Sequence, residues 1–214
     1  MGSVHKIQQT SLDPKPFQWK AGIRVLGVAE SFSRGDRTSY VAGVVMRGDL
    51  KIDGFCFCNP AVGGIDSTEQ FIRMYHNLKR TDIRTWLLGG SIISWFNTLD
   101  IHKIHQETET PVVSISYTPS EGLEKYVREY FPSEWEKRMA AIDSIGTRKE
   151  VMLNNGLKVF IVSAGIEEAA AVGIVNHFTH NGRIPEPVRV ARQLAASIRV
   201  YQKTIDSMKE EHSE

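Results

Sequence analysis

The sequence has few cysteines and no long apolar segment, and both shortages limit what the protein can be. Cys56 and Cys58 are the only cysteines among 214 residues, too few for a secreted domain held by disulfides. Alternate residues of one strand make poor disulfide partners, so we expect two reduced thiols in a cytosolic, cytoplasmic protein. No apolar run approaches the ~20 residues of a membrane-spanning helix, so we expect no membrane partner. The first ten residues lack a hydrophobic segment, which argues against a signal peptide.

Charge imbalance and phosphate-binding loops are also lacking. Lys and Arg number 26 against 25 Asp and Glu, a net charge of +1, which argues against strong sequence-blind attraction to a polyanion but allows a local basic face. No Walker loop and no Gly-x-Gly-x-x-Gly turn is present. The composition is that of a globular protein: 41% of the residues are hydrophobic, 24% are charged, and no segment is of low complexity. Such a chain forms one domain around a single core.

Local patterns divide the chain into three parts. Residues 1–22 are mostly polar and broken by Pro14 and Pro16, and we expect them to form an N-terminal arm. Residues 23–198 form the domain itself. Residues 199–214 are expected to form a C-terminal helical extension.

Apolar runs and capping residues predict the elements of the domain. The expected strands are 23–28, 40–46, 50–58, 83–88, 112–117 and 159–163. The expected helices are 67–78, 96–108, 120–130, 134–145, 167–178 and 187–211. Three strands followed by alternating helices and strands predict an α/β protein with a mixed sheet and helices on both faces.

The last predicted helix carries one apolar stripe at spacings of three and four residues, formed by Ala191, Leu194, Ile198, Tyr201, Ile205 and Met208. A helix over 187–211 would extend about 37 Å, longer than the core that it could cover. Two interpretations remain open: the stripe docks on the protein's own surface, or its end pairs with a protein partner or forms a homodimer.

The segment 181–197, NGRIPEPVRVARQLAAS, is a turn that opens this helix. Pro187 suits the first helical turn, and Glu186 places a carboxylate at the positive end of the helix dipole. Together with 24–27 (RVLG) and the Phe-Asn…Asp-Ile pattern of 96–101, this segment resembles the archaeal endonuclease dU family, relatives of endonuclease V, over roughly 23–198. The resemblance implies a ribonuclease H-like fold and an Mg²⁺-dependent endonuclease that cuts DNA near deaminated bases such as uracil, in DNA repair.

The family's acids are the ligands of that metal, and the resemblance places three of them on Ala29, Gly63 and Gly89. None of these residues has a side-chain oxygen, so we predict that the standard metal site is absent, and no metal ligands are identified. Three acids remain nearby as catalytic candidates, Glu30, Asp53 and Asp66, with Mg²⁺ as the cofactor if they act. We expect Asp66 to cap the helix after it rather than bind metal.

Arginines provide the candidate nucleic-acid contacts, namely Arg34, Arg37, Arg183, Arg189 and Arg192. Helix N-termini and arginines bind phosphate well, so the corner between Arg183 and Arg189 is the strongest candidate anion contact. The alternative is that these arginines are solvated charges balanced by nearby acids.

Two functions from different classes follow. The first is an endonuclease-like enzyme that acts on DNA with deaminated bases. The second is a non-catalytic nucleic-acid-binding or assembly protein that keeps the fold after losing the metal site.

Overall fold

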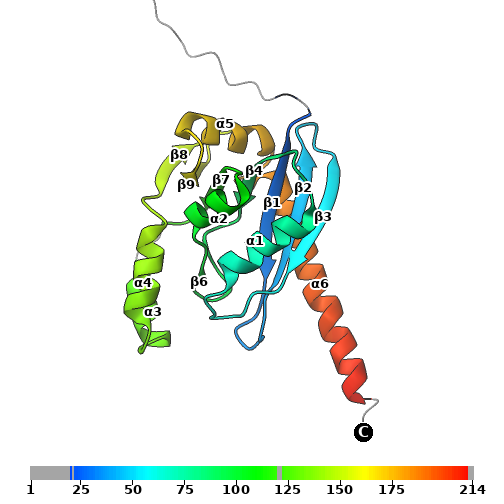
Figure 1. Ribbon diagram of the computed structural model, residues 1–214, viewed down its shortest axis with the longest axis vertical. Helices are drawn as coiled ribbons and strands as arrows, with labels where there is room; N and C mark the ends of the chain where they lie inside the picture. Colours follow the sequence, from blue (N-terminus) through cyan, green and yellow to red (C-terminus); the bar gives the residue numbers. More distant parts are fainter. Residues whose placement is uncertain (1–19, 21, 120–121, 212–214) are drawn as a thin grey trace, which may run out of the picture.

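The computed structural model describes residues 20, 22–119 and 122–211, and a seven-stranded sheet lies at its centre (Figure 1). The strand order is β3-β2-β1-β4-β7-β9-β8. These strands are β1 (Arg24–Ser31), β2 (Tyr40–Arg47), β3 (Ile52–Cys58), β4 (Ile83–Leu88), β7 (Val112–Ser116), β8 (Lys149–Met152) and β9 (Lys158–Ala164). A separate two-stranded sheet pairs β5 (Ile92–Ile93) with β6 (Asn97–Thr98).

The three central strands, β1, β4 and β7, run parallel, while β2, β3, β9 and β8 pair antiparallel toward the two edges. Parallel strands bring their carboxyl ends to one edge of a sheet. The residues that end β1, β4 and β7 therefore lie along the same edge.

Helices cover both faces of the sheet, as the sequence predicts (Figure 1). On one face lie α1 (Ser67–Leu78) and α2 (Ile101–Thr108), whose buried side chains join a core cluster with Leu26, Val28 and Trp86. On the other lie α5 (Glu168–Phe178) and α6 (Glu186–Glu211), which pack on a second cluster. A pair of short helices, α3 (Leu123–Tyr130) and α4 (Trp135–Ser144), projects at the side.

The predicted elements are largely present, with three differences. The two-residue strands β5 and β6 are not predicted, because they are too short to show a periodic pattern. The helix expected over 96–108 begins only at Ile101, because Asp100 accepts a 2.9 Å hydrogen bond from the Lys103 backbone N–H and caps it there. Strand β8 was not predicted. It is a short edge strand with mostly exposed side chains, so it lacks the apolar run by which the other strands were predicted.

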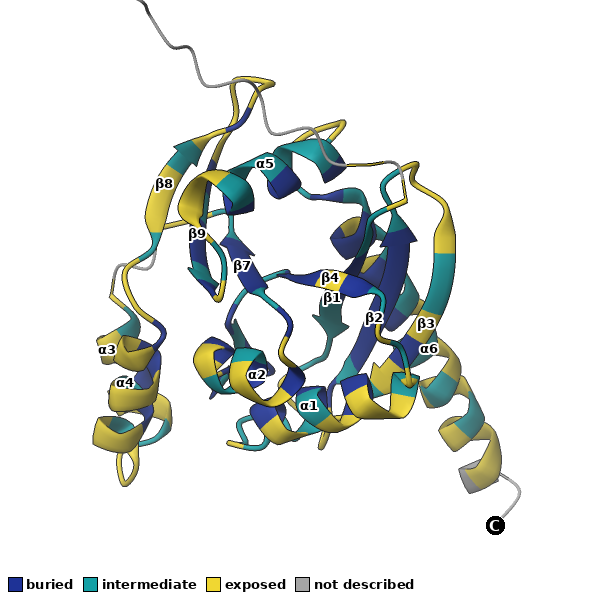
Figure 2. Ribbon diagram, turned by 45° about the horizontal axis from the view of Figure 1, so that its top comes forward, coloured by how far each residue is buried: buried dark blue, intermediate teal, exposed yellow. Residues whose placement is uncertain are grey.

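Helix α6 extends past the sheet (Figures 1 and 2). Ala191 and Ala195 are buried, whereas Tyr201 is 67% exposed and Met208 is 56% exposed. The interpretation in which the whole stripe docks on the protein's own surface is therefore wrong, because helix α6 continues beyond the end of the sheet. The helix is unbroken at residue 199, where Arg199 donates hydrogen bonds to Ser31 and Ser33, so the extension is continuous with the domain.

The expectations for the N-terminal arm fall mainly outside the described residues. Within the described ranges, no helix is long and apolar enough to cross a membrane. Cys56 and Cys58 are free thiols on β3, and burial raises the pKa of Cys56 to about 12.

Candidate nucleic-acid interface at the strand ends

Glu30 is the acidic side chain that β1 places at the carboxyl edge of the sheet. Its Oε2 accepts hydrogen bonds from the backbone N–H of Ser94, at 2.7 Å, and from the Ser94 hydroxyl, at 2.6 Å. The Ser94 carbonyl in turn accepts from the N–H of Gly63. Gly89, which follows β4, donates its N–H to the Val28 carbonyl beside Glu30. We call Glu30, Gly63, Gly89 and Ser94 the strand-end site.

Burial raises the pKa of the Glu30 carboxyl above its usual value. The two hydrogen bonds from Ser94 and the positive charge of Arg192 act in the opposite direction, but their effect is smaller. The site therefore favours a protonated, neutral Glu30 more than water does.

The positions where the resemblance expects acids are closed by their neighbours. A Cβ on Gly89 would lie 3.1 Å from Cγ1 of Val188 in α6, tighter than ordinary contact. Gly63 has a φ of +69°, which strains any other residue, and a Cβ there would meet the ring of Phe131 at 3.4 Å. A side chain at Gly89 would therefore have to displace Val188 slightly, and one at Gly63 is disfavoured by the left-handed backbone rather than by lack of space.

The residues present do not fit the Mg²⁺ ion that the fold family implies. Mg²⁺ requires near-octahedral oxygen ligands, usually including one or two carboxylates. Glu30 is the one carboxylate of the strand-end site. Within the part of the chain that the structure describes, no three His, Cys, Asp or Glu residues are grouped so that they could hold a metal ion.

Asp66 occupies the N-cap position of α1, but the prediction that its side chain caps the helix is wrong. Its carboxylate accepts instead from Asn97 Nδ2, at 2.8 Å, and from the Ala61 backbone N–H. The Ser67 N–H in the first turn of α1 donates to Oδ1 of the buried Asn97. A residue distant in sequence thus takes the capping role, and Asp66 holds the loop before α1 in place.

Asp53, a catalytic candidate from the sequence, lies at the opposite edge of the sheet from Glu30, so the two acids do not meet in one site. Asp53 forms ion pairs with Arg24 and Arg80, which hold the pKa of its carboxyl below the usual value. Arg24 begins β1 and Glu30 lies six residues further on. At about 3.3 Å per residue the two ends are roughly 20 Å apart, too far to share one ion.

The loop that holds Glu30 has an unusual backbone. Ser94, Trp95 and Phe96 have φ values of +45°, +62° and +61°, three successive residues in the left-handed region. This conformation costs each L-residue roughly 1–2 kcal/mol. Such strain persists only where surrounding contacts enforce it, and it is concentrated at functional sites.

Aromatic and cationic side chains gather beside this loop. The guanidinium of Arg34 lies 3.9 Å from the ring centroid of Trp95 and 5.4 Å from that of Tyr130. The Trp95 and Tyr130 rings are 4.7 Å apart, and the Tyr130 side chain is among the exposed large hydrophobic ones. We call Arg34, Trp95 and Tyr130 the aromatic cluster. The two rings are tilted at 58° to each other, and aromatic rings beside an arginine are the elements that bind unpaired bases.

The other arginines predicted to contact nucleic acid differ in whether their charge is free to bind a phosphate. Arg189 is bound by Glu186 at 2.6 Å, so Glu186 already neutralises one of the two cations of the Arg183–Arg189 corner, and an anion contact there stays a prediction. Arg183 donates to the Tyr117 carbonyl. Arg37 is exposed on the loop after β1. Arg192 is close enough to Glu30 and Tyr117 to lower the pKa of both groups.

Two contributors to the site were not predicted. Arg138 of α4 is 6% exposed and donates to the carbonyls of Gly63, Gly64 and Phe96, while its partner Glu134 lies one turn earlier in the helix. The spacing of four between Glu134 and Arg138 was the available sequence signal. Tyr117, after β7, has a buried hydroxyl without a hydrogen-bond partner in the described part of the chain, and nothing in the sequence marks it.

The sheet order, the helices on both faces and the strand-end site define a ribonuclease H-like α/β protein. Solved structures share this arrangement. A protein of unknown function from Archaeoglobus fulgidus matches with a TM-score of 0.69 and 26% identity, over 82% of this chain and 98% of that one. Endonuclease V from Ciona intestinalis, in complex with DNA that contains inosine, matches with a TM-score of 0.58 and 17% identity, over 86% and 87%.

Sequence comparison narrows the class to one family. The endonuclease dU family model matches residues 21–199. A UPF0215 protein from Pyrobaculum aerophilum is 32% identical over 181 residues, 84% of this chain and 96% of that one. A UPF0215 protein from Methanosarcina acetivorans is 32% identical over 189 residues, 85% and 93% of the two chains. The chain belongs to the endonuclease dU family.

Proposed function

We propose that this protein binds DNA that contains deaminated bases and does not cut it through a divalent-metal centre at the strand ends. It is then a non-catalytic nucleic-acid-binding member of a nuclease family. The observation that carries the proposal is the donor set of the strand-end site: Glu30 is its one carboxylate, and two of the positions where the resemblance expects acids are Gly63 and Gly89, which have no side-chain oxygen. The endonuclease V-like fold and the family membership support binding to nucleic acid.

The aromatic cluster is the proposed contact for an unstacked base. It directly adjoins the strand-end site, because Trp95 follows Ser94 in the strained loop. Base stacking on an aromatic side chain contributes about 1–3 kcal/mol per base and tolerates any base. Arg34 adds a positive charge that is available to phosphate, and Arg37 and Arg192 are further exposed cations.

A cleavage assay separates the proposal from the enzyme that the family suggests. Purified protein is incubated with duplexes that contain uracil or hypoxanthine, in Mg²⁺ and in Mn²⁺, with an undamaged duplex as control. We expect no product in any lane. Nicking of the modified strand by the wild type that disappears in Glu30→Gln would overturn the proposal and restore a nuclease.

A binding assay tests the proposed surface independently. Fluorescence anisotropy with the same duplexes should show salt-dependent binding. Trp95→Ala is expected to weaken it about tenfold, the effect of about 1.4 kcal/mol, and Arg34→Gln is expected to reduce its salt dependence. Arg84→Gln is the matched control, because Arg84 is an exposed cation near the start of β4, at the opposite edge of the sheet. Equal binding by all three variants would contradict the placement.

Assembly through α6 stays a prediction. Val200 and Tyr201 are 61% and 67% exposed beyond the sheet, where a protein partner or a second copy has access to them. Solution mass checks the homodimer: a monomeric wild type at high micromolar concentration contradicts it, and a dimer that dissociates in Tyr201→Asp supports it. The cytoplasmic location is likewise part of the proposal.

A further inference from the structure

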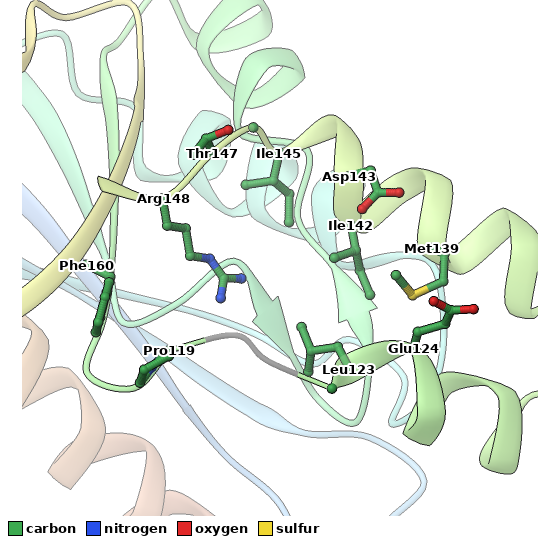
Figure 3. Close-up of a pocket in the computed structure, with 12 residues that line it drawn as sticks. Pro119, Leu123, Glu124, Met139, Ile142, Asp143, Ile145, Thr147, Arg148 and Phe160 are labelled. Atoms are coloured by element: carbon green, nitrogen blue, oxygen red, sulfur yellow. The ribbon is translucent and has the colours of Figure 1, made fainter. Parts of the chain in front are cut away.

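Two features of the fold are not explained by the proposed function. One is a pocket of about 660 Å³ beside helices α3 and α4, lined by Leu123, Ile142 and Phe160 among other residues (Figure 3). Its wall continues through residues 120–121, which lie outside the described part of the chain, so no ligand is assigned to it. The other feature is the end of α6 beyond the sheet, whose contacts at residues 199 and 203 are defined on both sides.

Arg199 and Lys203 lie one turn apart on α6, and both reach the loop between β1 and β2. Arg199 donates a hydrogen bond from Nε to the Ser31 hydroxyl, at 3.0 Å, and another from Nη1 to the Ser33 hydroxyl, at 2.6 Å. Nζ of Lys203 lies 2.8 Å from Oδ1 of Asp36, and Nη1 of Arg199 lies 3.6 Å from Oδ2. Since residues four apart share one face of a helix, a single face of α6 holds this loop.

The part of the loop that α6 holds is the turn that carries Arg34. A 2.9 Å hydrogen bond from the Asp36 N–H to the Ser33 carbonyl closes this β-turn, and the Ser33 N–H donates to Oδ2 of Asp36 at 2.8 Å. Arg34 and Gly35 are the two central residues of the turn. Both ends of the turn are therefore bound to α6, while the guanidinium of Arg34 lies 3.9 Å from the ring centroid of Trp95.

A second link binds the same loop to the strained segment that carries Trp95. The hydroxyl oxygens of Ser39 and Ser94 are 2.6 Å apart, and both side chains are buried. Ser94 is the first of the three successive residues with positive φ. The loop between β1 and β2 is thus held by α6 and by the strained segment together, which fixes Arg34 relative to the ring beneath it.

The ion pairs with α6 also keep a negative charge away from the arginines of the loop. Asp36 is two residues from Arg34 and one from Arg37, where a carboxylate would compete with phosphate for either cation. Among the described residues, the ion pairs of Asp36 are with Arg199 and Lys203 instead. Helix α6 therefore binds the acid of the loop and leaves its cations to other partners.

We propose that the end of α6 positions the DNA contact: Arg199 and Lys203 hold the turn so that Arg34 stays over Trp95 with its charge available to phosphate. Both are positioning residues, because they act on DNA through Arg34. The inference rests on the proposed function and gives the end of α6 a part in it. The family model matches only to residue 199, so Lys203 lies beyond the matched residues.

Asp36→Asn separates positioning from a simple effect of charge. Removal of an acid makes the protein more positive, which by itself strengthens binding to a polyanion. Positioning predicts the opposite, a binding to uracil-containing duplex about fivefold weaker than that of the wild type, because the turn loses its ion pairs to α6. Asp206→Asn is the matched control: it makes the same change at an exposed acid of α6 and should bind at least as tightly as the wild type.

A double-mutant cycle tests whether the effect passes through Arg34. In an Arg34→Gln background, Asp36→Asn should change the affinity by less than about twofold, because the group that it positions is already gone. Lys203→Gln breaks the same link from the side of α6 and leaves the hydrogen bonds of the turn in place. It should weaken binding in the wild type but not in the Arg34→Gln background, whereas a lysine that itself contacted phosphate would weaken binding in both.

The indole N–H resonance of Trp95 in ¹H–¹⁵N spectra reports the same geometry without DNA. It is assigned by its disappearance in Trp95→Ala. Asp36→Asn and Lys203→Gln should both shift this resonance in the direction of Arg34→Gln, because each moves the guanidinium from its place over the ring. Asp206→Asn should leave the resonance where it is in the wild type.

An indole resonance that is unchanged in both Asp36→Asn and Lys203→Gln overturns the inference, whether or not DNA binds. Binding by Asp36→Asn that equals or exceeds that of the wild type also overturns it, while the proposed function stands. A wild type that binds none of the duplexes contradicts the proposed function itself, and the inference fails with it.

Discussion

Gly27 of β1 lies directly beneath Pro187 in the first turn of α6. A Cβ on Gly27 would approach the Val188 backbone nitrogen to 2.7 Å and the Pro187 atoms more closely still. Two of the three segments that carry the family resemblance, 24–27 and 181–197, are therefore in contact. Glycine is required at this point because the strand and the helix N-terminus approach each other too closely for any side chain.

Gly27→Ala tests this close contact. The added methyl group must push the first turn of α6 away from β1, and overpacking of this kind costs about 3 kcal/mol. We expect a lower urea midpoint with an unchanged slope. Gly35→Ala is the matched control, because a Cβ there has no neighbour within 4 Å. Equal stability of the two variants would show that α6 does not pack as closely as described.

Glu30→Gln tests the buried carboxyl by its pH dependence. Burial raises the folded-state pKa of Glu30, so the folded protein binds this proton more tightly than the unfolded chain does. Its stability contribution is then fully present below the unfolded pKa and is lost as the pH rises through the folded pKa. We expect Glu30→Gln to be more stable than the wild type at neutral pH, with the difference shrinking toward pH 4. Urea midpoints across this range measure it, and a constant difference would argue against a raised pKa.

Arg138→Met tests the anchor of the strand-end loops. The substitution keeps much of the apolar stem but leaves the carbonyls of Gly63, Gly64 and Phe96 without their charged donor. The loss of several such hydrogen bonds should destabilise the protein by about 3 kcal/mol. Hydrogen exchange should also rise at the Ser94 and Gly63 amides. An unchanged unfolding midpoint would show that the loops are held by other contacts.

Asp53→Asn tests the assignment of this acid to a surface ion-pair cluster. Arg24 and Arg80 lower the pKa of Asp53, so its contribution to stability is present above the unfolded pKa and is lost as the pH falls through the folded one. The variant should lose less stability than Arg138→Met, and 1 M salt should reduce the loss. DNA binding should stay at the wild-type level. A large drop in binding would return Asp53 to the functional site.

The order of the elements could be predicted because their signals are local. Continuous apolar runs such as 23–28 and 83–88 mark central strands with two covered faces, and Pro185 and Pro187 mark the start of α6. The edge strand β8 could not be predicted in the same way, because one side of an edge strand faces solvent and its sequence carries no apolar run.

The candidate site was predicted only in part, because its residues come from separate segments. Glu30 was identified by its place at the end of the first strand, but its hydrogen bonds to Ser94 depend on a loop 64 residues away. Asp66 seemed a helix cap by its neighbours in sequence, yet Asn97 takes that role from a distant position. Asp53 lies near the start of β3, and the antiparallel pairing of β2 with β3 places it at the edge of the sheet opposite Glu30.

The sequence by itself determined the class of fold, the family, and the absence of acids at Ala29, Gly63 and Gly89. These depend on periodicity and on short motifs, which can be read along the chain. Only the tertiary structure decided which charges face each other: that Glu30 is buried against Ser94 and that Glu186 neutralises Arg189. The physical reason is that charge interactions and desolvation depend on distance in space, which spacing along the chain does not determine.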